Sequence, residues 1–127
     1  MIKDEQKKLI SAAIIRPNKM IYVGADHAAA SFEAGMQEGN FEFDEVKETS
    51  QQGFLDKLKK FHDRKAAYIQ ALGNGQIKPQ KEPILYSTEL QFSKRDLELA
   101  KQIADEHNKR ILEKKTKNGS ETWTQKN

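Results

Sequence analysis

The chain has 127 residues, of which 36% are hydrophobic and 32% charged, and its 22 basic and 19 acidic side chains give a net charge of +3. A chain of this length forms one domain with a modest core, and so mild a charge disfavours a protein that coats nucleic acid. Cysteine is absent, which excludes disulfides and thiolate chemistry, and neither a membrane span nor a signal-peptide core is visible in the sequence, so we expect a cytoplasmic protein.

The first predicted elements are a β-hairpin and a short helix. Leu9–Ile15 and residues 20–23 are rich in β-branched and aromatic side chains, and the turn between them contains Pro17 and Asn18. Residues 28–35 are predicted to form a helix with Asp26 as its N-cap. Residues 39–52 alternate only weakly, and we interpret them as a loop, with an edge strand as the alternative.

Two short strands and a second helix follow. Residues 53–55 and 60–62 each contain a phenylalanine, and a lysine-rich turn separates them. Asp63 then has the position of an N-cap for a helix over residues 64–72, because its carboxylate can accept hydrogen bonds from the free N–H groups of the first turn. A Gly-Asn-Gly segment at residues 73–75 ends this helix, and residues 76–83 form a connector with two prolines.

A long amphipathic helix is predicted over residues 93–115. Ser93 begins an S-x-x-D sequence, a variant of the capping box, and apolar residues recur at helical spacing from Leu97 to Leu112. This stripe packs either on the sheet of its own chain or against a partner molecule. We expect a homodimer in which Leu97, Ile103 and Ile111 are buried. Residues 116–127 have the composition of a flexible tail, so residues 1–115 make up a single α+β domain with a small antiparallel sheet, two short helices and the long helix.

The start of the second predicted helix has the composition of a nucleotide site. Lys60, Arg64 and further lysines lie beside Phe54 and Phe61 in the sequence. Helix N–H groups and cations hold phosphate, and an aromatic ring stacks a base. The alternative is that both rings are core residues and the lysines belong to a solvated turn, and the residue types alone favour this alternative.

The order of these features is similar to that of a known family. A glycine-phenylalanine-aliphatic step at residues 53–55 precedes a phenylalanine-x-aspartate-arginine step at residues 61–64 and an alanine-rich helix that ends near Gly75-Gln76-Ile77. With the segment 84–90 and the hairpin at residues 11–24, this pattern resembles a family of small phage proteins over roughly residues 10–90. That family includes the anti-Thoeris sponges, which sequester the cyclic ADP-ribose isomers that a bacterial host makes as an alarm.

The resemblance implies a non-catalytic sponge that blocks host anti-phage defence. Such a protein would enclose a cyclic ADP-ribose isomer between the subunits of a homodimer or larger homo-oligomer in the host cell cytoplasm, without any cofactor. In this role Phe54 would stack a base and Arg64 would pair with the diphosphate. The ligand-binding residues that the resemblance implies are Phe54, Leu55, Lys60, Phe61, Asp63, Arg64, His27, Tyr86 and Ser87.

The chain departs from this family pattern after its first hairpin. Many relatives carry a basic residue and paired histidines there, whereas this sequence has Asp26 followed by His27 alone. The three histidines of the chain lack metal-binding spacing, and no nucleophile elbow is present, so neither a metal site nor catalysis is expected. The alternative function is a protein-interaction module that binds a host protein through the C-terminal helix.

Overall fold

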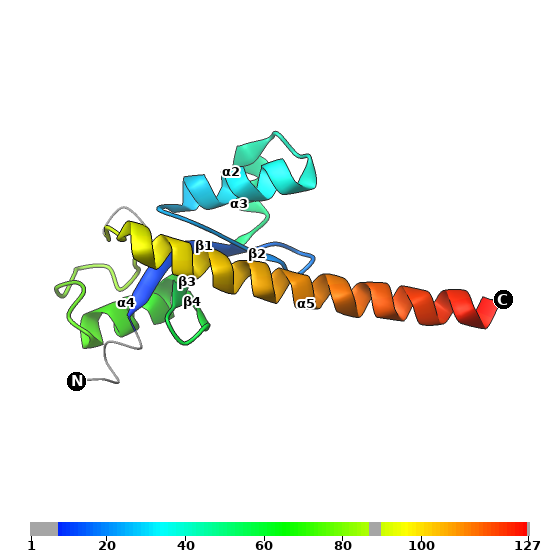
Figure 1. Ribbon diagram of the computed structural model, residues 1–127. Helices are drawn as coiled ribbons and strands as arrows, with labels where there is room; N and C mark the ends of the chain where they lie inside the picture. Colours follow the sequence, from blue (N-terminus) through cyan, green and yellow to red (C-terminus); the bar gives the residue numbers. More distant parts are fainter. Residues whose placement is uncertain (1–7, 87–89, 127) are drawn as a thin grey trace.

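The protein is a three-layer α+β structure around a four-stranded antiparallel sheet (Figure 1). The structure is a computed structural model that describes residues 8–86 and 90–126, with side chains as far as residue 114. The strands follow the spatial order β2-β1-β3-β4. Their bounds are β1 Leu9–Ile15, β2 Ile21–Gly24, β3 Gln51–Asp56 and β4 Phe61–Asp63. The predicted fold class is therefore confirmed.

The predicted hairpin is formed by β1 and β2. Ile15 of β1 pairs with Ile21 of β2, and the turn between them closes where the Arg16 N–H donates to Met20 O at 2.9 Å. Lys19 adopts the left-handed conformation in this turn, with φ of 74°. Because β1 is hydrogen-bonded to both β2 and β3, it lies inside the sheet, and its side chains are buried on both faces.

Three helices cover one face of the sheet and a fourth covers the other. Ile14 and Ala12 of β1 pack against α2 (His27–Glu38), α3 (Phe43–Glu48) and α4 (Arg64–Gly73). Ala13, the residue between them, belongs to the cluster that packs against α5 (Lys94–Lys126), because successive side chains of a strand point to opposite faces. Figure 1 shows α5 crossing the sheet and extending beyond it.

The segment that we interpreted as a loop or edge strand contains the short helix α3. Phe43 and Val46 are three residues apart, so in a helix they lie on the same side. Val46 is buried in the cluster beneath α2, and the ring of Phe43 packs against that of Phe32, with centroids 4.9 Å apart. The acidic residues of the first turn of α3 also favour a helix at this position. The expected loop was wrong because the weak alternation of phenylalanines concealed this spacing.

Both predicted aspartate caps are present. Asp26 accepts a hydrogen bond from the Ala29 N–H at 2.7 Å at the start of α2, and Asp63 accepts one from the Ala66 N–H at 2.8 Å at the start of α4. The predicted Ser93 cap of α5 is present as well, since its hydroxyl accepts from the Asp96 N–H at 3.1 Å.

The central part of the apolar stripe of α5 packs against its own sheet, whereas Leu112 near the end of the stripe is 52% exposed. Ala100, Ile103 and Ala104 are buried in the same cluster as Ile21 and Leu55. The helix continues to Lys126, past the end predicted at residue 115, and no proline interrupts this part of the chain. In the part of the chain that the structure describes, no helix is long and apolar enough to cross a membrane.

Arg16 fixes the position of α2 and α3 relative to the sheet. Its guanidinium donates from Nε to Glu38 Oε2 at 2.9 Å and from Nη2 to Glu38 Oε1 at 3.1 Å, so the two side chains form a bidentate pair. Its Nη1 donates to Val46 O at 2.9 Å, Thr49 Oγ1 at 2.6 Å and Ser50 Oγ at 3.0 Å. One buried side chain thus joins the end of β1 to the C-terminal ends of both helices.

Asn108 of α5 pairs with the outer edge of the sheet. Its Oδ1 accepts from the Ile21 N–H at 2.8 Å, and its Nδ2 donates to Ile21 O at 2.8 Å. Both peptide groups of this edge-strand residue are therefore hydrogen-bonded to a single side chain. The interaction also fixes α5 along β2.

Candidate functional site

The two phenylalanines of the predicted nucleotide site lie on opposite faces of the sheet. Phe54 is opposite His62 and Leu55 is opposite Phe61 in the β3–β4 pairing. Phe54 is fully buried in the cluster beneath α4, and Leu55 is fully buried in the cluster beneath α5. Phe61 is half-buried and packs with Leu55. The structure therefore does not bring the aromatic pair to one site, and the ring of Phe54 has no exposed face on which a base could stack.

His27 is also part of the interior. Its Nε2 lies 2.8 Å from Gly53 O, so this nitrogen carries the proton and donates to the carbonyl. The imidazole packs edge-on against Phe54, with ring centroids 5.2 Å apart. Burial lowers the pKa of His27, and the positive charges of Arg64 and Lys47 lower it further, while the hydrogen bond to Gly53 and the charge of Asp26 oppose the shift.

The lysine-rich turn between β3 and β4 is held by Asp56. This buried carboxylate accepts from the Leu58 N–H at 2.7 Å, from the Lys60 N–H at 3.0 Å and from His62 Nε2 at 2.7 Å. Lys60 itself is exposed, and Lys59 takes the left-handed conformation with φ of 70°. An acidic residue directly before a polar turn is the sequence signal that could have revealed this arrangement.

Three of the predicted residues that remain accessible lie together at the start of α4. The guanidinium of Arg64 lies 5.7 Å from the ring centroid of Tyr86, a cation–π distance. Asp63 is exposed while it caps the helix, whereas Lys60 lies in the β3–β4 turn, at the other end of β4. We refer to Asp63, Arg64 and Tyr86 as the Arg64 corner. Ser87, which was predicted to line the same site, is outside the described residues.

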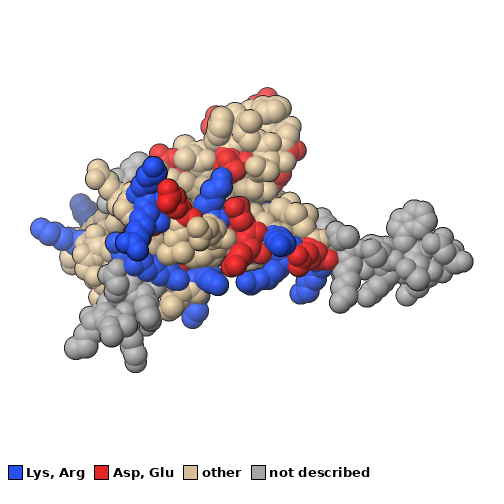
Figure 2. All heavy atoms as spheres, viewed as in Figure 1, with Lys and Arg blue, Asp and Glu red and all other residues tan. Residues whose placement is uncertain are grey.

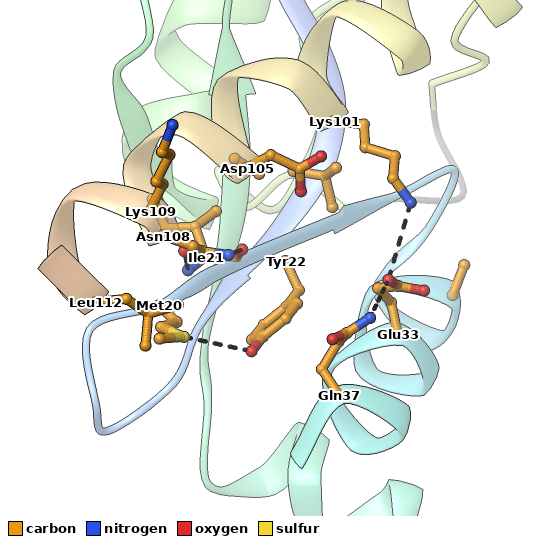
Figure 3. Close-up of a pocket in the computed structure, with 13 residues that line it drawn as sticks. Met20, Ile21, Tyr22, Glu33, Gln37, Lys101, Asp105, Asn108, Lys109 and Leu112 are labelled. Carbon is orange, nitrogen blue, oxygen red and sulfur yellow. Dashed lines mark hydrogen bonds and ion pairs between the residues drawn. The ribbon is translucent and has the colours of Figure 1, made fainter. Parts of the chain in front are cut away.

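A groove of about 490 Å³ lies elsewhere, between α2, β2 and α5 (Figure 3). Its floor is the edge strand with Tyr22 and Val23, one wall is α2 with Glu33, and the other is α5 with Lys101 and Asp105. The remaining lining residues are Met20, Ile21, Ala29, Gln37, Ala104, Asn108, Lys109 and Leu112. Because the α5 wall comes from residues 101–112, far in the sequence from the lining residues 20–37, their spacing gave no signal of the groove.

Charged side chains span the mouth of the groove. Lys101 of α5 lies 3.9 Å from Glu33 of α2, and Gln37 donates to the same carboxylate at 3.3 Å (Figure 3). These side chains are largely solvent-exposed, so the Lys101–Glu33 pair contributes less than about 1 kcal/mol and can open readily. The groove thus combines an apolar floor with two carboxylates and two lysines at its rim.

The Tyr22 hydroxyl lies at the floor of this groove and has a weak acceptor. It donates to the thioether of Met20, with the oxygen 3.6 Å from the sulfur. Burial raises the pKa of Tyr22, and the charges of Glu38 and Glu33 raise it further against the opposing charge of Arg16. The hydroxyl therefore stays protonated, and an oxygen atom would accept its hydrogen bond better than sulfur does.

The mild net charge conceals two oppositely charged regions. Residues 25–50, which include α2 and α3, contain seven acidic residues and Lys47 as the single basic one. Residues 57–81, which include β4 and α4, contain seven basic residues and Asp63 as the single acidic one. Figure 2 shows acidic side chains on the α2–α3 lobe, defined as residues 25–50, and basic ones toward the α4 end. Because the two excesses largely cancel, the total charge of +3 gives no sign of this separation.

Fold and site define a small α+β protein with an open, ligand-sized groove. Among the residues that the structure describes, no group of three or more histidine, aspartate or glutamate side chains is placed to hold a metal ion. A family model described as Phage T4 y16D protein matches residues 8–95, so the chain belongs to the phage T4 y16D protein family. Comparisons with curated proteins and with solved structures gave no match.

The family match covers the sheet and the helices α2 to α4, and it ends in the first turn of α5. The Arg64 corner lies within the matched residues. The groove is formed only in part by them, because the wall that carries Lys101 and Asp105 belongs to α5 beyond the match.

Proposed function

We propose that this phage-family protein binds and sequesters a nucleotide signal of the cyclic ADP-ribose type without cleaving it. The resemblance of residues 53–77 to the anti-Thoeris sponge pattern supports the ligand class. The groove between α2, β2 and α5 is the observation that carries the proposal, because sequestration requires a concave site, and small-molecule sites have volumes of about 300–1,000 Å³. At about 490 Å³ the groove is within that range.

The lining of the groove suits the three parts of such a ligand. The apolar surface of Val23 and Ala104 would contact a base, as apolar pocket walls do in small-molecule sites. Glu33 and Asp105 would accept hydrogen bonds from ribose hydroxyls, as acidic residues do in dinucleotide sites. Lys101 would leave its weak pairing with Glu33 and bind a phosphate. The hydroxyl of Tyr22 would donate to a ligand oxygen in place of the Met20 sulfur.

Sequestration acts through mass action and requires no reaction. The protein lowers the free concentration of the signal below the level to which the host effector responds, which demands tight binding. Micromolar affinity corresponds to about 8 kcal/mol and nanomolar affinity to about 12 kcal/mol. A groove that exists before the ligand binds loses less free energy in becoming ordered, so it can reach this range with few contacts.

The competing function was a module that grips a host protein with the C-terminal helix. The central part of the apolar stripe that suggested it packs on the sheet of the same chain through Ala100, Ile103 and Ala104, while Leu112 near its end is 52% exposed. No contact of the described residues favours a host-protein partner, and we keep nucleotide sequestration as the single proposal.

Calorimetric titration with cyclic ADP-ribose isomers tests the proposal. We expect saturable binding, and we expect the ligand to be recovered intact by chromatography after the complex is heated. The double substitution Lys101→Ala and Asp105→Asn should weaken binding by at least tenfold, the loss of one or two charge-assisted hydrogen bonds. Lys94→Ala, at the first residue of α5 and outside the groove, is the matched control and should bind as the wild type does.

The same titration distinguishes the groove from the Arg64 corner. If Arg64→Ala abolishes binding while the groove variant binds normally, the nucleotide binds at the corner and the assignment to the groove is wrong. Recovery of a cleaved ligand would show an enzyme. Absence of binding to any isomer at millimolar concentration would refute the proposed function itself.

A further inference from the structure

The α2–α3 lobe carries an exposed aromatic patch. Phe32, Met36 and Phe41 expose 52%, 50% and 66% of their surface, and Phe43 connects them from below. Ring centroids are 4.9 Å apart between Phe32 and Phe43 and 6.2 Å apart between Phe41 and Phe43, so the three rings form one contiguous surface, and Met36 lies one helical turn after Phe32 on α2. Exposed apolar surface of this kind, with a charged border, marks interaction sites more often than single exposed side chains do.

The border of the aromatic patch is acidic. Glu42 lies between Phe41 and Phe43 in the sequence, and Glu45 is exposed on α3. The lobe as a whole has seven acidic residues against one basic residue. A partner for this patch therefore needs an apolar contact surrounded by positive charge.

The outer face of α4 has that composition. Ile69 is 70% exposed, the largest exposure among the large hydrophobic side chains of the described residues, and Lys65 lies one helical turn before it. The neighbouring connector adds exposed Lys78 and Lys81, and the segment 57–81 contains a single acidic residue. Complementary charge and an apolar centre are thus both present on another face of the same chain.

We propose that the aromatic patch of one molecule binds the α4 face of a second copy of this chain. This contact is heterologous, since a lobe-to-lobe contact would place two strongly acidic surfaces against each other, and like charges repel. It differs from the assembly expected from the sequence, in which α5 forms the interface. The central part of the stripe of α5, with Ala100, Ile103 and Ala104, packs on the sheet of its own chain instead.

The size of the patch sets the strength of the contact. Three large side chains that are about half exposed offer roughly 300 Å² of apolar surface, whereas a stable interface buries about 800 Å² on each partner. The surrounding charges must supply the rest of the contact area. Association is therefore expected at micromolar concentrations and should weaken as salt screens the charges.

The proposal goes beyond ligand binding and does not depend on it. The groove is lined by Ala29, Glu33 and Gln37 of α2, whereas the patch uses Phe32 and Met36 of the same helix. If the protein failed to bind a nucleotide, the proposed self-association would be unaffected. If the protein failed to self-associate, the proposed nucleotide binding would be unaffected.

Sedimentation velocity with two charge-reversal variants tests the contact. The lobe variant carries Glu42→Lys and Glu45→Lys, and the α4 variant carries Lys65→Glu and Lys78→Glu; all four positions are exposed, so both variants should fold. The wild type should associate with rising concentration in 50 mM salt and dissociate in 500 mM salt. Each variant alone should associate at least tenfold more weakly, because one of its two faces now repels the other.

Mixing the two variants gives the sharpest result. The lobe variant keeps its basic α4 face, and the α4 variant keeps its acidic lobe. These two unaltered surfaces can bind each other, so the equimolar mixture should associate again. Circular dichroism and thermal melting would establish that both variants are folded. A wild type that remains monomeric at 100 µM in low salt would overturn the proposal, as would association that neither variant changes. A lobe variant that associates more strongly alone would show a lobe-to-lobe contact instead.

Discussion

Replacing Arg16 by lysine is expected to destabilise the protein by about 3 kcal/mol, although the positive charge is retained. The guanidinium donates two hydrogen bonds to Glu38 and three to acceptors at the end of α3, and only 8% of the residue is exposed. A lysine ammonium has three donors that radiate from one point, so it cannot form the bidentate pair and also reach the carbonyl of Val46.

The magnitude follows from the groups left without partners. Hydrogen bonds to a charged group contribute about 1.5–3 kcal/mol each, and loss of one partner of a buried ion pair costs about 3–5 kcal/mol. The Glu38 side chain is 24% exposed, so water can solvate part of its charge and lower this cost. We therefore place Arg16→Lys near 3 kcal/mol and Arg16→Met at about 3–5 kcal/mol.

Urea denaturation followed by circular dichroism measures this loss. With a slope of about 1–3 kcal/mol per molar urea, a change of 3 kcal/mol lowers the midpoint by roughly 1–3 M. A double-mutant cycle of Arg16→Met and Glu38→Met should give a coupling energy of about 1.5–3 kcal/mol. Arg110→Lys is the matched control, because Arg110 is largely exposed on α5 and its replacement should change stability by less than about 0.5 kcal/mol. A loss below 1 kcal/mol for Arg16→Lys, or a coupling energy near zero, would refute this reasoning.

Three further predictions concern buried side chains of the sheet and its helices. Phe54→Ala should lower the free energy of unfolding by about 3–5 kcal/mol, because it creates a cavity next to His27; a variant within 1 kcal/mol of the wild type would mean that the ring is not a core residue. Asp56→Ala should lower it by about 2–4 kcal/mol through loss of three hydrogen bonds, and Asp56→Asn by less because its amide oxygen can still accept; equal losses in urea titrations would contradict this view of the turn. The folded-state pKa of His27 is lowered, so the unfolded chain takes up its proton first, and unfolding should become easier as pH falls from about 7 to 5, by at most about 1.4 kcal/mol per pH unit. His27→Gln should remove this part of the pH dependence, and an unchanged slope would show that other groups cause it.

Local signals in the sequence were sufficient for most of the fold. The turn after β1 and the caps Asp26, Asp63 and Ser93 depend on residues within a few positions of one another, and the structure has all of them. The helix α3 was missed although its signal is also local, because Phe43 and Val46 have helical spacing inside a segment that alternates weakly.

The predicted site depended on information that the sequence does not contain. Whether Phe54 and Phe61 share a face is decided by the register of β3 against β4, and a shift of one residue moves a side chain to the other face. In the structure Phe54 is opposite His62, so Phe61 points toward α5. The groove was equally hidden, because α2, β2 and α5 meet only after the chain has folded.

The pairing of Asn108 with Ile21 bears on how much of this protein a cell can hold in solution. An open strand edge is a template on which another chain can add a strand, and aggregation begins there. The carboxamide of Asn108 takes the place of the next strand at Ile21, because it fills both the N–H and the C=O of that residue. At the opposite edge β4 is only three residues long, which leaves little length for pairing. A protein that acts by the proposed sequestration must reach the concentration of its ligand, and a sheet with one edge capped at Ile21 and the other edge short offers little template for β-aggregation at that level.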